Sequence, residues 1–430
     1  MNGTYEEAVN ENGIKLHFIP TEKFKTIAIT AKFKSHLEQE TITQRALLPY
    51  VLQQGTQSYP SRSALQTKLD SLYGAVLSIN GSKKGNYHIV TIRLEIANQK
   101  FISHESDIID EAVALFREII FDPNHEESNA FPQAVVSREK DILRQKINTV
   151  ADDKMRFANM RLIDEMCHDE RYKLHIHGYE DDLDRITAEN LYTYYRSMLQ
   201  DDQIDIYVSG DIDSAALKAK MLPAFQYDGR SGSKKSAQDT EKYPDQPNVV
   251  IEKQQIQQAK LHFGYRTHIM FGDDDYFALH VFNGLFGGFP SSKLFINVRE
   301  KNSLAYYVAS RFESHKGLLF VFSGIAPQDF EQARDIIEQQ MEAMKNGDFT
   351  EDELTNTKEL IVNQLLETMD NSKGMVELLY QQVAGDMVLS PESMIEGIKN
   401  VSKDEVINVA KKLDLDTIYL LTGSGGDTDE

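Results

Sequence analysis

Residues 284–310 of this chain read GLFGGFPSSKLFINVREKNSLAYYVAS, and the other segments are best interpreted outward from them. This stretch opens with three glycines, Gly284, Gly287 and Gly288, at the end of an apolar run. Glycine allows backbone angles that are closed to other residues, and it lets another segment approach the backbone closely. The glycines therefore predict a tight loop at this point of the chain.

A short helix and then a strand are expected after this loop. Ser291 or Ser292 can cap the helix, and the apolar residues that follow recur at three- and four-residue spacing on one face. Residues 304–310 are predicted to be extended. Arg299 and Tyr306 then lie close to one end of a helix–strand corner, where they either pack or bind.

The motifs of this stretch carry a family resemblance. In this order, Gly-Gly, Ser-x-Leu-Phe, Val-Arg-Glu-Lys and Leu-Ala-Tyr closely resemble the second domain of the pitrilysin/insulinase-type zinc peptidases, the inverzincins, which include the processing peptidases of mitochondria and bacteria. In that family an arginine and a tyrosine at these places help to hold the substrate backbone opposite a zinc site on the first domain. The resemblance, which covers nearly the whole chain, implies this substrate-binding role for Arg299 and Tyr306, together with Gly287 and Gly288.

The zinc motif of the family, His-x-x-Glu-His, is lost from this chain. Histidines four apart on a helix share one face and can bind one metal, with the glutamate between them as general base. In the first long helix, which Gly55 ends, the motif falls on residues 46–50. Ala46 and Tyr50 occupy the histidine positions, and Pro49 occupies the position of the base. Alanine has no ligand atom, proline cannot take a proton, and tyrosine is an uncommon zinc ligand.

The third zinc ligand of the family is a glutamate on a later helix, seven residues after another acid. In VVSREKDILRQKINT, at residues 135–149, the first acid is Glu139 and the ligand position falls on Lys146, whose ammonium repels a cation. The resemblance therefore implies no metal, no cofactor and no catalytic residue in this chain. Zinc is expected only in a partner.

Other candidate clusters are interpreted as structural. His175 and His177 could share one face of a strand and bind a metal, but a loop before Gly178 is the favoured interpretation. Cys167 is adjacent to His168 without the flanking glycines of a nucleophile turn, and adjacency does not create a hydrogen-bonded pair. An active enzyme with an unrecognised metal or nucleophile is an open alternative that none of these residues supports.

The composition indicates a soluble protein with more than one domain. The chain has 430 residues, which exceeds one ordinary core. A net charge of −21 is expected to repel nucleic acid and anionic membranes, and no apolar run reaches the roughly 18 to 20 residues that span a bilayer. No signal peptide is visible, and the single cysteine, Cys167, fits a reducing compartment. We expect a cytoplasmic protein that binds neither nucleic acid nor membranes.

The two halves of the chain repeat one plan of strands followed by helices. Residues 72–74 correspond to residues 304–306, and the strand at 204–210 corresponds to the strand at 417–423. The expected division is residues 1–226 as an N-terminal domain with the degenerate zinc site, residues 227–248 as a polar linker, and residues 249–430 as a C-terminal domain. Strands followed by runs of helices predict an α+β fold with largely antiparallel sheets. The resemblance implies helices on one face of each sheet and a half-clamshell of two similar domains.

Two functions fit these observations. The first is the non-catalytic, substrate-binding subunit of a heterodimeric peptidase, whose partner is a homologue of similar length with an intact zinc helix and whose substrates are peptides. The second is a homodimeric scaffold or peptide-binding protein without peptidase activity. The loss of the zinc elements, together with retention of Arg299 and Tyr306, favours the first.

Overall fold

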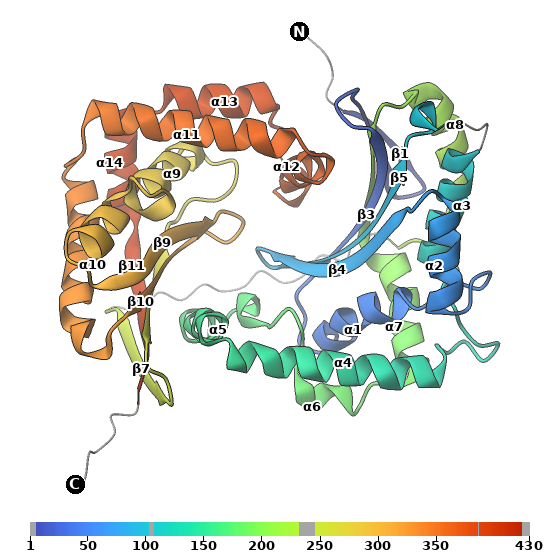
Figure 1. Ribbon diagram of the computed structural model, residues 1–430, viewed down its shortest axis with the longest axis horizontal. Helices are drawn as coiled ribbons and strands as arrows, with labels where there is room; N and C mark the ends of the chain where they lie inside the picture. Colours follow the sequence, from blue (N-terminus) through green and yellow to red (C-terminus); the bar gives the residue numbers. More distant parts are fainter. Residues whose placement is uncertain (1–5, 103–106, 232–245, 386, 424–430) are drawn as a thin grey trace. The chain divides into compact units, whose positions relative to one another are not determined.

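The structure is a computed structural model that describes residues 6–102, 107–231, 246–385 and 387–423. The chain divides into two compact units, and most of their helices and strands are labelled in Figure 1. Unit 1 consists of Met1–Thr149, Leu174–Gln238 and Met369–Leu379; unit 2 consists of Val150–Lys173, Asp239–Thr368 and Tyr380–Glu430. Each unit therefore takes one segment from the other half of the chain. Of the expected linker, residues 232–245 lie outside the described residues.

Unit 1 is built on a six-stranded sheet in the order β1-β2-β6-β3-β5-β4. Neighbouring strands are antiparallel, except for the parallel pair β2 and β6. The elements of this unit are β1 (Glu7–Glu11), β2 (Ile14–Pro20), β3 (Thr26–His36), α1 (Ile42–Leu52), α2 (Arg62–Ser71), β4 (Val76–Lys84), β5 (Tyr87–Ala97), η1 (Gln99–Phe101), α3 (Ile108–Phe121), α4 (Gln133–Asp152), α6 (Glu180–Leu183), α7 (Ala188–Asp201), β6 (Gln203–Gly210) and α8 (Ser214–Ala224).

Unit 2 is built on a five-stranded sheet in the order β7-β11-β8-β10-β9. Its elements are α5 (Lys154–Met166), η2 (Arg171–Lys173), β7 (Asn248–Gln254), β8 (Ala259–Arg266), α9 (Tyr276–Asn283), η3 (Gly284–Gly288), η4 (Phe295–Glu300), β9 (Ala305–Glu313), β10 (Leu318–Ile325), η5 (Pro327–Asp329), α10 (Phe330–Lys345), α11 (Glu351–Met369), α13 (Pro391–Asn400), α14 (Lys403–Lys412) and β11 (Asp414–Gly423). The helix α12 (Ser372–Ala384) begins in unit 1 and ends in unit 2. Within the described part of the chain, no helix has both the length and the apolar character needed to cross a bilayer.

The two sheets share one topology. The order β2-β6-β3-β5-β4 in unit 1 corresponds, strand for strand, to β7-β11-β8-β10-β9 in unit 2. Both contain a single parallel pair at the same place, β2 with β6 and β7 with β11. Strand β1 is an additional edge strand of unit 1. The predicted internal repeat and the predicted α+β fold with largely antiparallel sheets are confirmed.

The apolar face of the first sheet forms the main core of unit 1. Alternation along β3 turns Ile27, Ile29 and Phe33 to this face. They pack with residues of the covering helices, including Leu47 and Leu48 of α1. Burial of each such side chain is worth roughly 1.5–3 kcal/mol. The set also specifies the strand register, because a slip of one residue would move these side chains to the other face.

The second face of this sheet is polar and is covered by Met369–Leu379. Lys32 on β3 is 1% exposed, and its ammonium donates to Glu377 at 2.5 Å. The hydroxyl of Ser372 lies 2.6 Å from the hydroxyl of Ser209 on β6. Hydrogen bonds and an ion pair thus hold this segment on the sheet.

The five-stranded sheet of unit 2 is also covered on both faces. Alternation along its strands places Leu319 and Ile418 in the main core of the unit. Phe320 and Leu421 point to the opposite face, where they pack with Leu162 of α5. The family resemblance implied helices on one face of each sheet, and the structure adds a covering segment on the second face in both units.

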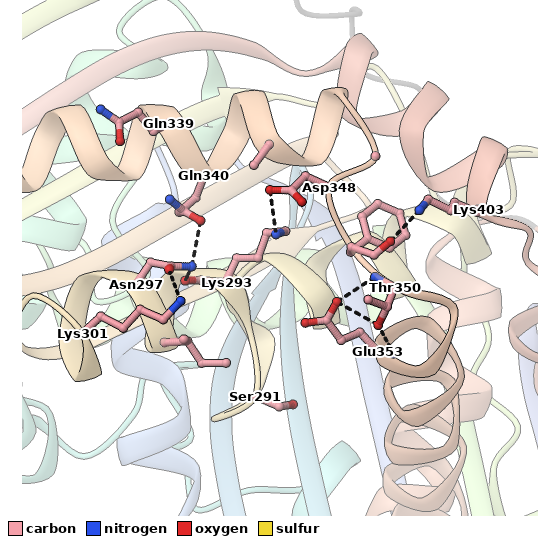
Figure 2. A pocket seen from close by; sticks show the side chains of 14 residues that line it. Ser291, Lys293, Asn297, Lys301, Gln339, Gln340, Asp348, Thr350, Glu353 and Lys403 are labelled. Carbon is pink, nitrogen blue, oxygen red and sulfur yellow. Dashed lines mark hydrogen bonds and ion pairs between the residues drawn. The ribbon is translucent and has the colours of Figure 1, made fainter.

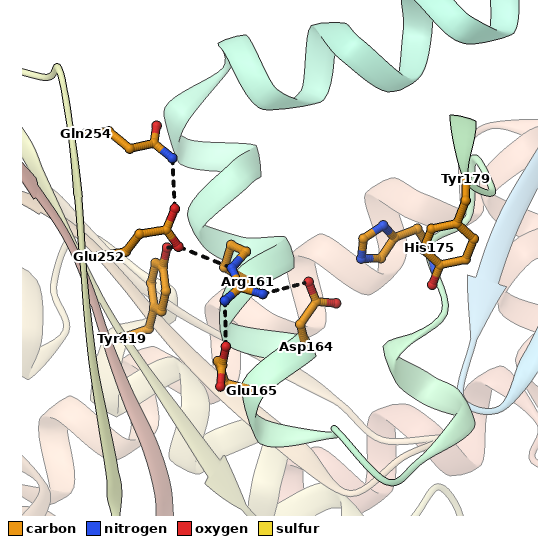
Figure 3. A network of polar contacts seen from close by, with 8 residues as sticks. All are labelled: Arg161, Asp164, Glu165, His175, Tyr179, Glu252, Gln254 and Tyr419. Atoms are coloured by element: carbon orange, nitrogen blue, oxygen red, sulfur yellow. Dashed lines mark hydrogen bonds and ion pairs between the residues drawn. The ribbon is translucent and has the colours of Figure 1, made fainter. Parts of the chain in front are cut away.

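Arg161 on α5 makes polar contacts that attach this helix to the second sheet (Figure 3). Its Nε donates to Glu252 on β7 at 3.2 Å, and its Nη2 donates to Glu165 at 2.5 Å. Glu252 also accepts from the hydroxyl of Tyr419 on β11 at 2.7 Å. Burial alone would raise the pKa of Glu252, but the bonds from Tyr419, Gln254 and Arg161 lower it. The charged carboxylate therefore links α5 to two adjacent strands.

The predicted tight loop at the three glycines is wrong in its conformation. The structure continues α9 into a π-helical turn, η3, and Gly284, Gly287 and Gly288 all avoid positive φ angles. The glycines are required for space instead. A Cβ on Gly287 would lie 2.6 Å from Ser310 Oγ, and a Cβ on Gly284 would lie 2.5 Å from Thr357 Cγ2. The close approach that glycine permits is made by β9 and α11 of this chain.

A buried histidine on β2 bridges β6 and the residue that precedes β1. His17 on β2 has its Nε2 3.0 Å from Asp205 Oδ1 on β6, and its Nδ1 contacts Glu6, which precedes β1. The ring stacks on Tyr207 with centroids 4.1 Å apart. Burial alone would lower the pKa of His17, but the hydrogen bonds to Asp205 and Glu6 raise it. A carboxylate at each ring nitrogen favours the doubly protonated cation.

Replacing His17 by glutamine is expected to cost most stability at acidic pH. A histidine whose pKa is raised by folding stabilises the native state fully below its unfolded pKa of about 6.5, and this contribution is lost as the pH rises through the folded pKa. The difference in unfolding free energy between wild type and H17Q should therefore be largest below about pH 6.5 and shrink above it. Urea unfolding across this range measures it. A difference that is constant or grows with pH would contradict the ion-pair assignment.

Candidate functional site

Ala46, Pro49 and Tyr50, where the sequence indicates a lost zinc motif, lie on α1. Ala46 is 6% exposed and belongs to the core of unit 1, and Tyr50 packs against the same core. Pro49 has no N–H to donate within the helix, and its carbonyl accepts from Gln53 Nε2 at 2.9 Å. This part of α1 is occupied by packing contacts.

Helix α4 brings an acid close to Tyr50. Burial and the nearby carboxylate of Glu139 raise the pKa of Tyr50, which keeps the phenol protonated and makes it a poor metal ligand. Glu139 is 2% exposed and accepts a hydrogen bond from Arg138 Nε at 2.9 Å. Arg138 Nη2 donates a second hydrogen bond, 2.8 Å long, to the side chain of Gln54, which follows α1. Lys146 follows about two turns further along α4.

These side chains do not fit a zinc ion. Zinc is bound by deprotonated or neutral nitrogen, sulfur and oxygen donors, usually three or four of them from the protein. A methyl group, a pyrrolidine ring, a protonated phenol and an ammonium group supply no such set. Over the described residues, no group of three or more His, Cys, Asp or Glu side chains is arranged to hold a metal ion. Metal-assisted hydrolysis therefore has no ligand set on α1 and α4.

A buried arginine beside Ala46 is the residue that sequence reasoning missed. Arg45 is 1% exposed, and it donates to Asp202 Oδ2 at 2.6 Å, to the Tyr194 hydroxyl at 3.0 Å and to His88 Nδ1 at 3.1 Å. Burial alone would lower the pKa of Arg45, but Asp202 raises it. The available signal was a charged residue at the start of the apolar helix stretch RALLPYVL, residues 45–52.

Arg299 and Tyr306, the implied substrate-holding residues, are both exposed in unit 2. Arg299 lies in η4 and its side chain is 43% exposed. Its guanidinium lies over the Phe295 ring, 4.7 Å from the centroid, and its Nε is 3.6 Å from Glu300. Tyr306 is the second residue of β9 and is 67% exposed. In the described sheet β9 is the last strand, so both side chains stand at the sheet edge or just before it.

Gly287 and Gly288, the other implied binding residues, differ from one another. Gly287 is buried, and its contact with Ser310 explains the need for glycine there. Gly288 is exposed, and a Cβ on it would lie 2.9 Å from Asn283 Nδ2. Asn283 in turn accepts from Ser310 Oγ at 2.8 Å. Of the two glycines, Gly288 presents backbone to solvent.

The other clusters considered from the sequence are accounted for by packing. His175 stacks on Tyr179, with ring centroids 5.0 Å apart. Gly178 has a φ of +70°, and a Cβ on it would lie 2.4 Å from Thr43 Oγ1. Cys167 is buried in the apolar cluster between α5 and the second sheet.

Comparisons with known proteins determine the family. A family model described as the peptidase M16 inactive domain matches residues 185–361. A probable inactive metalloprotease of Bacillus subtilis (strain 168), YmfF, is 47% identical over 415 residues, which covers 96% of this chain and 97% of that protein. This chain belongs to the M16 peptidase family. The resemblance indicated by the sequence motifs is confirmed, and the chain is an inactive homologue of the M16 metalloproteases.

Solved structures show the same M16 fold. A conserved protein from Enterococcus faecalis V583 has a TM-score of 0.89 at 35% identity, covering 98% of this chain and 99% of that one. A peptidase M16 inactive domain from Pseudomonas fluorescens has a TM-score of 0.81 at 17% identity, covering 98% and 99%. At this lower identity the likeness concerns the fold alone. The M16 fold accordingly extends over nearly the whole chain.

Proposed function

We propose that this M16 homologue is the non-catalytic, substrate-binding subunit of a heterodimeric peptidase. Its partner is a family member of similar length that retains the His-x-x-Glu-His motif and carries the zinc. The observation that carries the proposal is a contrast between two sites. The zinc positions on α1 are taken by residues that pack and the one on α4 is a lysine, whereas Arg299 and Tyr306 are exposed.

The exposure of Arg299 and Tyr306 argues against a purely structural role. Arginine is commonly exposed, but an arginine that holds a fold pairs with groups elsewhere in the chain, as Arg45 does with Asp202 in unit 1. The contacts of Arg299 are instead with Phe295 and Glu300 of its own helix, and these leave much of its side chain in solvent. An exposed arginine and an exposed tyrosine on one corner are residue types enriched at binding surfaces.

The chemistry of this corner suits a peptide backbone. Because β9 is the last strand of the described sheet, a row of its N–H and C=O groups points away from β10. An extended peptide can pair with such an edge. The guanidinium of Arg299 can donate to peptide carbonyls, and the hydroxyl of Tyr306 can donate or accept. A peptide held in this orientation loses less entropy on reaching the transition state at a zinc site on the partner.

Arg299→Ala is expected to lower the kcat/KM of the purified pair roughly 10- to 100-fold, because a hydrogen bond from a charged donor is worth about 1.5–3 kcal/mol. Tyr306→Phe removes only a hydroxyl and should lower kcat/KM by a smaller factor, roughly five-fold. The zinc content of the partner should not change in either variant. Turnover of a fluorogenic peptide and metal analysis of the same preparation measure both quantities.

Arg334→Ala provides the matched control. Arg334 lies on α10 with its side chain 33% exposed, and it pairs with Glu338 at 2.9 Å. Its removal changes the net charge equally and should leave turnover within two-fold of wild type. Unchanged turnover in Arg299→Ala would contradict the proposal. Recovery of the native chain only as a zinc-free self-associated dimer would favour the homodimeric scaffold instead.

A further inference from the structure

A pocket of about 870 Å³ lies in unit 2 between the η4 segment, α10 and the starts of α11 and α14 (Figure 2). Lys293, Asn297, Lys301 and Gln340 are among its lining residues, whereas Arg299 and Tyr306 are not. The pocket therefore does not use the two side chains to which the proposed function assigns the peptide.

Two charged side chains of this pocket are engaged by the protein itself. Glu353 Oε2 accepts from the backbone N–H of Thr350 at 2.7 Å and from its hydroxyl at 3.1 Å, which caps the start of α11. Lys403 donates to the carbonyl of Phe349 at 2.5 Å and lies over the Phe349 ring, 4.8 Å from its centroid. Glu353 and Lys403 therefore stabilise the fold around the pocket. The lining lysines left to bind a ligand are Lys293 and Lys301.

Lys293 and Lys301 supply positive charge on the η4 side. Asn297 connects them, because its Nδ2 donates to the carbonyl of Lys293 at 2.9 Å and its Oδ1 accepts from Lys301 Nζ at 3.3 Å. The side chain of Lys293 is only 16% exposed, yet its carboxylate partner, Asp348, is 3.9 Å away and 82% exposed. Because this ion pair is long and its carboxylate is solvated, a closer anion in the pocket can compete for the Lys293 ammonium.

Gln340 on α10 adds a neutral hydrogen-bond donor beside these two lysines. Its Oε1 accepts from Asn297 Nδ2 at 2.8 Å, and Figure 2 shows the two side chains meeting beside Lys301. Since the amide oxygen is used in this way, the NH₂ group remains the part of Gln340 that can serve a ligand. Ammonium groups and an amide NH₂ together match the two acceptor oxygens of a carboxylate.

We propose that this pocket binds a carboxylate, with Lys293, Lys301 and the amide of Gln340 as its donors. The carboxylate belongs either to a small dicarboxylic acid or to an acidic side chain of a peptide. Phosphate is a poorer match, because phosphate sites typically use the arginine fork or a cluster of backbone N–H groups at a helix start. The described residues that line this pocket include no arginine, and the start of α11 is occupied by Glu353.

Calorimetric titration of the full chain with four probes tests the proposal. Succinate is expected to bind, while its diamide, succinamide, and inorganic phosphate are expected to bind at least ten-fold more weakly. An acidic tetrapeptide of glutamates identifies the source of the carboxylate: tighter binding than succinate assigns the pocket to peptides, and weaker binding assigns it to small acids. Equal affinity for succinate and succinamide would overturn the proposal, as would tighter binding of phosphate than of succinate.

Lys293→Gln and Lys301→Gln locate the binding in the pocket. Each variant keeps most of the side-chain length and is expected to weaken succinate binding about ten-fold or more. Lys345→Gln is the matched control, because Lys345 lies on α10, pairs with Glu342 at 2.8 Å and does not line the pocket. Lys301 is exposed, so its variant is informative even if Lys293→Gln fails to fold. Wild-type affinity in Lys301→Gln, or equal loss in Lys345→Gln, would overturn the proposal.

Arg299→Ala separates this inference from the proposed function. Because Arg299 does not line the pocket, its variant should bind succinate with wild-type affinity while turnover by the pair falls. Loss of succinate binding in Arg299→Ala would overturn the independent pocket. Unchanged turnover with intact succinate binding would contradict the proposed function alone.

Discussion

Replacing Glu170 by glutamine is expected to destabilise unit 2 by roughly 3–5 kcal/mol, the usual cost of breaking a buried ion pair. Glu170 follows α5 and is 3% exposed; its Oε1 lies 2.8 Å from Arg266 Nη2, and its Oε2 lies 2.6 Å from Lys316 Nζ. Asp416 completes the cluster, 2.9 Å from Arg266 Nε. The substitution leaves two buried cations of this cluster with one carboxylate. It also weakens the attachment of residues 150–173 to the second sheet.

Glu165→Gln is the matched control for this prediction. Glu165 lies on α5 itself, and its ion pair with Arg161 at 2.5 Å is 30% exposed on both sides. A partly exposed pair is worth at most about 1 kcal/mol. The chain contains no tryptophan, so differential scanning calorimetry or circular dichroism should follow unfolding. Equal destabilisation by the two variants would contradict the larger contribution of the buried Glu170 ion pairs.

Asp202→Asn is expected to destabilise unit 1 by a similar amount, roughly 3–5 kcal/mol. The variant leaves the Arg45 guanidinium buried without its carboxylate. Phe33 O still accepts from Arg45 Nη2 at 2.7 Å, but a carbonyl carries no full negative charge. His88 offers no compensation, because burial and the charge of Arg45 lower its pKa well below the usual value and keep the ring neutral.

A double-mutant cycle tests the cause of this loss. Arg45→Met combined with Asp202→Leu removes both charges and should recover most of the stability, since well-packed apolar residues often replace a buried pair without loss. Asp184→Asn is the surface control: Asp184 is 85% exposed and lies 3.2 Å from Arg144, so its removal should cost less than about 1 kcal/mol. A double variant as unstable as Asp202→Asn would point to packing as the cause.

The fold was predictable where the sequence carried periodic information. The second half repeats the strands of the first in the same order, although it is shorter before its last strand, and the alternation along β3 indicated one buried face. The exchanged segments were not predictable in this way. α5 and the start of α12 have ordinary amphipathic patterns, and nothing in such a pattern states which sheet will receive the apolar or polar face. That assignment depends on partners such as Glu377 for Lys32, which lie far apart in the chain.

The candidate site was predictable where residue identity alone excludes chemistry. Once the family resemblance assigns their positions, Ala46 and Pro49 cannot serve as ligand and base in any environment, so the sequence predicts that the zinc motif is lost. The glycines of η3 were harder, because glycine serves both unusual angles and close packing, and only coordinates distinguish the two for Gly287. The pairing of Arg45 with Asp202 joins residues on different elements and was likewise invisible. The roles of Arg299 and Tyr306 remain predictions that turnover measurements will decide.

The segment exchange has a consequence for how this protein emerges from the ribosome. Lys32 and Glu377 are separated by 345 residues, which takes roughly 20 to 70 s to translate at about 5–20 residues per second. During that time the nascent first repeat has its ammonium without its counter-ion, and α5 has been made before the sheet that covers its apolar side. The first repeat therefore cannot complete its fold before residues 369–379 have been synthesised, whereas α5 is already present when the second sheet forms. The exchanged segments therefore make the folding of one repeat depend on the synthesis of the other.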